Sequence, residues 1–280
     1  MKNFFTKERL RTIVCVVLSF FICLGVFAIT ICADLLVVSS PNFAVSAAQK
    51  SNYSKYAVNQ LTEELNDLAI PSGLPENFFT GKIDEDEFNT LFFTVLENTI
   101  RANKDYKLSL EDFNTQVLNM VTEYSKNEVG DFSENVEKDI VRFANECENI
   151  YLSYINPSLL SYSLTVLNSS RKYVNIALVL SAVFVLIIGI VLFRLNYVSS
   201  FIKYCFTIFG GAALAAGVIP AYLLATNEIS RISISSKSLY AVVTTYAQQI
   251  LWVILISAII LASVAFILLL IKIFTLIFRK

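Results

Sequence analysis

Residues 81–88, GKIDEDEF, hold a dense group of carboxylates and resemble the second half of an EF-hand calcium loop. Such a loop binds calcium through oxygen ligands at positions 1, 3, 5 and 12, with glycine at position 6. With Gly81 at position 6, Glu87 falls correctly at position 12. Positions 3 and 5, however, become Phe78 and Thr80. Because the carboxylates for one side of the ion are missing, we expect no EF-type calcium binding here.

A second copy of this pattern favours a helix start instead. KIDEDEFNT at residues 82–90 recurs as KLSLEDFNT at residues 107–115. In the first copy, Glu87 follows the potential N-cap Asp84 by three residues, which is the spacing of a capping box. In the second copy, Asp112 follows Ser109 in the same way. Acidic residues in a first turn also suit the positive end of the helix dipole. We therefore predict that two helices begin at these two caps.

Other side chains that carry out chemistry are scarce. The chain has no histidine, which removes the commonest general base and the commonest metal ligand. Its five cysteines show no metal-ligand spacing. Cys147 is interpreted as a small buried apolar residue, with a disulfide to Cys32 as the alternative. The sequence therefore assigns no catalytic residue, no cofactor and no metal ligand.

Small residues spaced by four form the one candidate site in the apolar part of the chain. Two such pairs lie in the segment 204–225, and a third repeats the spacing in the segment 250–272. Small residues at this spacing let two helices approach closely in lipid, so we predict that these segments pack together. The predicted packing residues are Gly211, Ala213, Ala215, Gly217, Ala258 and Ala262.

Apolar segments dominate the composition. Hydrophobic residues make up 55% of the chain, charged residues only 16%, and the mean hydropathy is +0.61. A helix of about 20 apolar residues crosses a membrane. Four segments satisfy this requirement, namely residues 12–33, 173–193, 204–225 and 250–272. We therefore expect an all-α, multi-pass membrane protein embedded in the lipid bilayer.

The basic residues predict how the chain is oriented. They gather in the N-terminal segment 1–11, in the link 194–203 and in the C-terminal segment 273–280. The positive-inside rule places these three segments in the cytoplasm of a protein of the plasma membrane. The segments 34–172 and 226–249 then lie outside. The first apolar run exceeds the about 7 to 15 residues of a cleavable signal peptide, so we predict an uncleaved signal anchor.

The segment 34–172 is acidic and helical in pattern. It contains 11 Lys and Arg against 21 Asp and Glu, a formal charge of −10. This charge argues against nucleic acid and favours solubility, basic partners or loosely held cations; a solvated helical surface is its simplest explanation. Apolar residues recur at helical spacing in four stripes, of which the longest begins at Phe132 and includes Cys147 and Tyr154. We predict an extracytoplasmic bundle of about four helices, inserted between spans one and two.

Two functions fit this organisation. No ionisable residue lies deep in a predicted span, which argues against an ion-coupled transporter. We therefore expect a binding or sensing protein that presents its outer bundle to a protein partner, as an accessory or scaffold component of a membrane complex. The alternative is a membrane-embedded enzyme or transporter component that acts on lipid or envelope substrates. A cleft with converging carboxylates, or a polar cavity between spans, would favour this alternative. Nothing in the sequence sets an oligomeric state.

Overall fold

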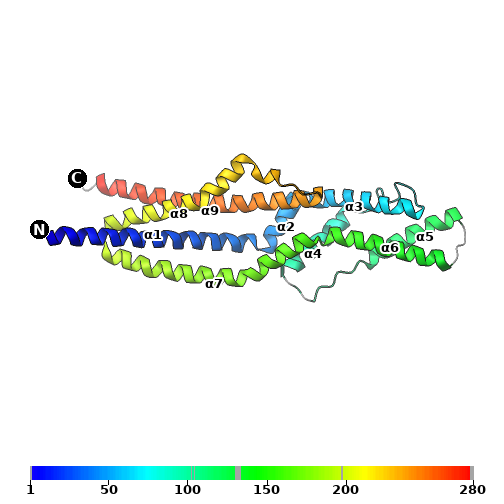
Figure 1. Ribbon diagram of the computed structural model, residues 1–280, viewed down its shortest axis with the longest axis horizontal. Helices are drawn as coiled ribbons and strands as arrows, with labels where there is room; N and C mark the ends of the chain where they lie inside the picture. Colours follow the sequence, from blue (N-terminus) through cyan, green and yellow to red (C-terminus); the bar gives the residue numbers. More distant parts are fainter. Residues whose placement is uncertain (1, 102, 104, 130–133, 197, 278–280) are drawn as a thin grey trace. The chain divides into compact units, whose positions relative to one another are not determined.

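The computed structural model describes residues 2–101, 103, 105–129, 134–196 and 198–277. Within these residues the regular elements are helices and no strand occurs, so the predicted all-α class is confirmed (Figure 1). The chain divides into two compact units. The spanning unit comprises Met1–Ser40, Ser169–Ile232 and Tyr246–Lys280, and the bundle unit comprises Pro41–Asn168 and Ser233–Thr245. The bundle unit thus includes part of the predicted second outer segment.

Four of the described helices are long and apolar enough to cross a membrane. The apolar stretches are Glu8–Val38, Ser158–Leu195, Ser200–Thr226 and Lys237–Thr275. They belong to α1 (Lys2–Val38), α7 (Ser158–Leu195), α8 (Val198–Thr226) and α9 (Lys237–Ile277). Each helix contains one predicted span and continues beyond its limits, because a helix does not end where a charge appears. The four helices indicate a multi-pass membrane protein.

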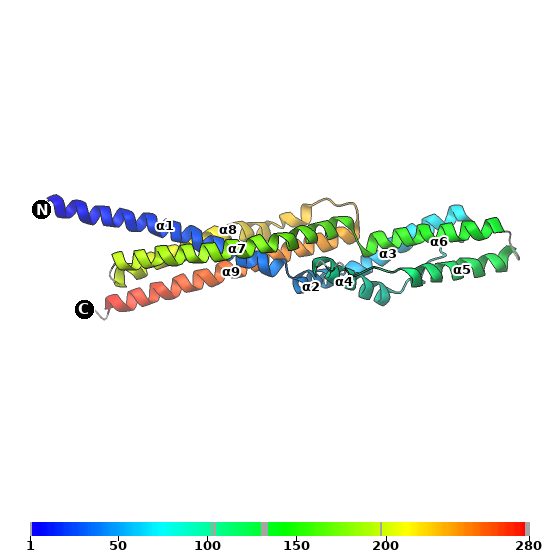
Figure 2. The ribbon, with the colours of Figure 1, turned by 90° about the horizontal axis from the view of Figure 1, so that it is seen from below.

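The spanning unit has a small apolar core and an apolar exterior. Helix α1 runs beside α8 and packs most closely against it (Figures 1 and 2). The core of the spanning unit contains Cys15 and Ile22 of α1, Leu192 of α7 and Ile208 of α8. Many large apolar side chains of the unit face outward, and Leu214 is 68% exposed. An exterior of this kind suits lipid, since soluble proteins avoid large exposed apolar patches.

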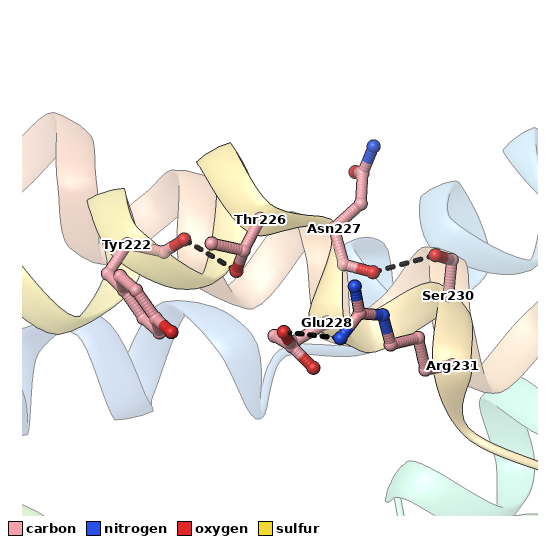
Figure 3. Close-up of polar contacts among 6 residues, drawn as sticks. All are labelled: Tyr222, Thr226, Asn227, Glu228, Ser230 and Arg231. Carbon is pink, nitrogen blue, oxygen red and sulfur yellow. Dashed lines mark hydrogen bonds and ion pairs between the residues drawn. The ribbon is translucent and has the colours of Figure 1, made fainter.

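Helix α8 ends in a short polar connection that leads toward α9. Asn227 follows the helix with a left-handed φ of 52° and precedes the 3-10 turn η2 (Glu228–Arg231). Asparagine adopts this conformation more readily than most residues. Figure 3 shows the local contacts, which are Thr226 Oγ1 to the Tyr222 carbonyl (2.9 Å), Ser230 Oγ to the Asn227 carbonyl (2.6 Å) and Arg231 to Glu228 (2.9 Å). The two hydroxyl groups thus bond to backbone carbonyls at and just after the end of α8, and the ion pair joins the two ends of η2.

The bundle unit is built around α3 to α6. Its helices are α2 (Pro41–Lys50), α3 (Tyr53–Ala69), α4 (Glu85–Arg101), α5 (Glu111–Val129) and α6 (Glu134–Ile155), with the 3-10 turn η1 (Ile70–Ser72) after α3. Helices α5 and α6 lie side by side, and α3 packs against both α4 and α6 (Figures 1 and 2). Leu61, Phe88 and Cys147 are fully buried in the core. The predicted burial of Cys147 is thus confirmed.

The longest predicted stripe is buried only in part. Ile140 and Phe143 of α6 are buried, as expected. Val136 is 39% exposed, so the prediction fails at the start of the helix, where the described neighbours do not cover it. Phe132 lies outside the described residues.

Residues 75–82 form a turn that docks onto the core. Phe78 and Phe79 are buried, at 6% and 1% exposure. Asn66 of α3 accepts the Phe79 N–H at 2.8 Å and donates to Thr80 Oγ1 at 3.2 Å. Gly81 then takes a φ of +73°, which glycine adopts without strain. The segment that resembles half a calcium loop thus begins at the end of this turn, and its residues 85–88 form the first turn of α4.

The two related helix starts differ by one residue. Asp84 Oδ1 accepts the Asp86 N–H at 2.8 Å, which confirms the predicted cap of α4. Helix α5 instead begins at Glu111, because the Asn114 N–H bonds to the Leu110 carbonyl. Ser109 Oγ accepts the Glu111 N–H, at 3.4 Å. The predicted cap of α5 at Ser109 is therefore wrong by one position.

Candidate functional site

A pocket of about 450 Å³ opens between the first turns of α4 and α5. The carboxylates of Asp86, Glu87 and Asp112 line it, and all three side chains are exposed. Its deeper lining includes Leu110 and Tyr151, which are buried at 6% and 4% exposure. The pocket therefore combines an acidic, wet rim with an apolar and aromatic floor.

The two related nonapeptides converge at this pocket. Phe88 and Phe113 occupy the same position in the two copies, and both rings contact Tyr151 of α6. The Phe113 ring stacks on Tyr151 with centroids 4.1 Å apart, and Phe88 meets it edge-on at 5.6 Å. The acidic residues that directly precede these phenylalanines, Glu87 and Asp112, both line the pocket. The repeat thus places one aromatic support and one carboxylate from each helix around a single tyrosine.

The asparagine after each phenylalanine fixes its helix to a neighbour. Asn89 Oδ1 accepts a hydrogen bond from Ser54 Oγ of α3 at 2.6 Å. Asn114 donates through Nδ2 to Glu148 Oε2 of α6 at 2.5 Å and to Asn145 Oδ1 at 3.1 Å. Each copy of the repeat therefore supplies its own polar anchor, and the walls of the pocket are held from both sides.

The pocket carries negative charge without a compensating cation. Burial, together with the smaller effects of the Glu87 and Asp84 carboxylates, raises the pKa of Tyr151 to about 12. Tyr151 is therefore neutral at physiological pH and adds no charge of its own. Among the described residues that line the pocket, none is basic. This arrangement favours a cationic group that also offers an apolar or planar surface.

A second tyrosine cluster joins α3 to α6. Tyr53 OH donates to the Tyr154 carbonyl at 2.7 Å, and Tyr154 OH donates to Glu64 Oε1 at 2.6 Å. Burial raises the pKa of Tyr53 and of Tyr154, and the adjacent Glu64 adds to the effect on Tyr154. Both hydroxyls thus act as neutral donors in a helix–helix contact rather than as acids.

The described part of the chain contains no cluster of metal-binding side chains and no disulfide. No group of three or more His, Cys, Asp or Glu side chains is placed there to hold a metal ion. All five cysteines are free thiols, so the alternative bridge between Cys32 and Cys147 is not formed.

The predicted small residues of α8 face two different helices. A Cβ on Gly211 would lie 3.0 Å from Cys23 Sγ, so this glycine faces α1. A Cβ on Gly217 would lie 3.1 Å from the Ala258 Cβ, so that glycine faces α9. Ala213 is buried at 7% exposure, whereas Ala215 is exposed. The structure therefore brings Gly217 and Ala258 together, and Ala213 and Ala262 line the same groove between α8 and α9. Ala215 does not line that groove, and the Cβ position of Gly211 faces α1.

Three small residues outside the prediction are also buried in the spanning unit. Ala212 and Ala216 of α8 are 0% and 3% exposed, and Ala265 of α9 is 4% exposed. Ala212 and Ala216 are themselves four apart, so the same spacing could have identified them. A groove of about 720 Å³ between α8 and α9 is lined mainly by apolar residues, including Ala213, Gly217 and the exposed Ala262.

Comparison with known proteins finds no match for this chain among protein-family models, curated proteins or solved structures. An inference about function therefore rests on the geometry of the chain itself. Of the features described, the acidic pocket between α4 and α5 combines charge, shape and a preorganised aromatic floor most clearly.

Proposed function

We propose that this chain is a membrane-embedded binding protein whose acidic bundle holds a basic side chain of a protein partner in the pocket between α4 and α5. The carrying observation is the set of three carboxylates above an aromatic floor. An arginine suits this combination, because its guanidinium pairs with carboxylates while its flat face and stem lie on aromatic and apolar groups. The formal charge of −10 in residues 34–172 also favours encounter with a basic partner.

The proposal includes the orientation of the chain in the membrane and its role in a complex. The basic segments 1–11, 194–203 and 273–280 support cytoplasmic termini in the plasma membrane, with the acidic bundle outside. A bundle carried by four apolar helices and offering a charged pocket suits an accessory or scaffold component of a membrane complex.

The enzyme alternative also predicts a cleft with carboxylates. The surroundings of these carboxylates therefore distinguish binding from catalysis. Acid–base catalysis by two carboxyl groups requires different surroundings, so that one holds a proton and the other does not. Asp86, Glu87 and Asp112 are all exposed to solvent and lie in the first turns of their helices. The groove between α8 and α9 has a mainly apolar lining, unlike a polar substrate path. These features support binding better than catalysis.

Site-specific cross-linking in the full-length protein tests the proposal. A photoreactive residue at Thr94, which is exposed and lines the pocket, should capture the partner in intact cells. The triple variant Asp86→Asn, Glu87→Gln and Asp112→Asn should abolish this product, because the pocket loses its charge.

A matched control is available in α6. The triple variant Glu134→Gln, Glu137→Gln and Asp139→Asn removes the same charge from exposed positions at another helix start and should retain the cross-link. Equal loss in both triple variants would mean that general acidity, rather than the pocket, binds the partner.

A further inference from the structure

Asp34 is a carboxyl group buried inside the spanning unit. Its charge marks the predicted end of the first span, yet α1 continues to Val38 and Asp34 is only 6% exposed. Ser257 Oγ of α9 donates a hydrogen bond to Asp34 Oδ1 at 2.6 Å. The second oxygen, Oδ2, is buried and has no hydrogen-bond partner among the described residues. An ionisable group that the sequence placed just outside the first span thus lies near the end of the apolar stretch Glu8–Val38.

No cation faces this carboxyl group from the described residues of the neighbouring helices. On α1 the next charged residue toward the N-terminus is Arg11, which a helical rise of about 1.5 Å per residue places roughly 35 Å away. Helix α8 carries no charge after Lys203, and α9 carries none between Lys237 and Lys272. Helix α7 carries Arg171, Lys172 and Arg194, but all three side chains are exposed, and no ion pair with Asp34 occurs among the described residues.

Two more polar groups occur on the same pair of helices. Tyr246 OH of α9 donates to the Val38 carbonyl of α1 at 2.9 Å. Gln249, one turn further along α9, has a buried Nε2 without a partner among the described residues. Buried polar atoms are almost always hydrogen-bonded, so an unpaired acceptor and an unpaired donor in one apolar unit require an explanation.

We propose that Asp34 is a proton-binding site of the spanning unit. The proton resides on Oδ2, while Oδ1 keeps the hydrogen bond from Ser257 that joins α1 to α9. Binding of the proton removes a charge that has no counter-ion, and its release leaves a buried carboxylate held by Ser257 alone, an unfavourable arrangement in an apolar surrounding. Carboxyl groups inside membrane spans commonly mark such proton sites. This inference does not depend on the pocket between α4 and α5.

A hydrophobic carbodiimide, dicyclohexylcarbodiimide, tests the site in the full-length protein in detergent. The reagent adds to protonated carboxyl groups in apolar surroundings, and mass spectrometry locates the adduct. We expect an adduct at Asp34 at acidic and neutral pH that declines at alkaline pH. Asp34→Asn should abolish it, whereas Glu8→Gln, at an exposed position on the same helix, should leave it unchanged.

Infrared spectroscopy provides a second readout that needs no access for a reagent. The C=O stretch of a protonated carboxylic acid should be present in the wild-type protein and in Ser257→Ala, and should disappear on alkaline titration. A wild-type protein without this band at acidic and neutral pH would overturn the proposal. Suppression of the adduct by sodium ions at constant pH would also overturn it, since a metal cation would then be the ligand.

Discussion

Tyr151 tests the pocket and the bundle core together. Its ring is buried at 4% exposure between Phe113, at 4.1 Å, and Phe88, at 5.6 Å. Replacing it with alanine removes both aromatic contacts and leaves a cavity, which costs about 3–5 kcal/mol for a buried aromatic residue. Tyr151→Phe keeps the ring and should cost about 1 kcal/mol or less. Tyr162→Ala, at a position that is 73% exposed, should change stability by only about 0.5 kcal/mol.

The thiol of Cys147 can report this loss in the full-length protein. Cys147 is 0% exposed, so a water-soluble thiol reagent reaches it only when the bundle opens. In a background without the other four cysteines, a loss of about 3–5 kcal/mol should accelerate labelling by about two to four orders of magnitude. Labelling of Tyr151→Ala at the same rate as Tyr162→Ala would refute the assignment of Tyr151 to the core.

Three further predictions concern the helix cap, the buried thiol and the orientation. Asp84→Ala should cost about 1 kcal/mol in a denaturant titration because it removes a helix cap, whereas Ser109→Ala should cost less than half as much. Burial and the neighbouring Glu146 raise the pKa of Cys147 from 9.0 to about 12, so the folded state retains the thiol proton to higher pH than the unfolded state does. The thiol proton therefore contributes fully to stability below about pH 9, and this contribution is lost progressively as the pH rises toward about 12. The difference in unfolding free energy between the wild type and Cys147→Ala should narrow over that range. A cysteine at Ser235 should react with an impermeant reagent on intact cells and one at Ser200 should not; the reverse pattern would contradict the proposed orientation.

Local patterns predicted the class of the fold and several of its details. The four charge-free segments predicted the four long helices correctly, because a membrane-spanning helix is recognised from the length and composition of its own segment. The N-cap at Asp84 was also predictable, since a cap depends on residues within one turn. The same rule misplaced the start of α5, where Leu110 accepts the first helical bond and Ser109 bonds only weakly.

The features that the sequence did not predict depend on contacts between residues far apart in the chain. Asp34 and Ser257 are 223 residues apart, so a rule that treats a charge as the end of a span could not find their hydrogen bond. In α8, the run GGAALAAG offers several overlapping pairs at a spacing of four, which cannot reveal that Gly211 faces α1 while Gly217 faces α9. The repeat around Phe88 and Phe113 was visible, but its convergence on Tyr151 required the packing of three helices.

The carboxylates of the pocket have two effects, and these can be separated. Acidic residues in a first turn stabilise their helix by about 0.3–1 kcal/mol each through the helix dipole, so neutralising Asp86, Glu87 and Asp112 should lower stability by about 1–3 kcal/mol whether or not the pocket binds anything. The control triple variant at the start of α6 carries a comparable penalty, because Glu134 and Glu137 lie in the first turn and Glu134 also pairs with Lys138 at 2.8 Å. A difference in partner capture between variants of similar stability therefore measures binding in the pocket. Capture that instead follows stability across both variants would show that these carboxylates act only on the helices that bear them.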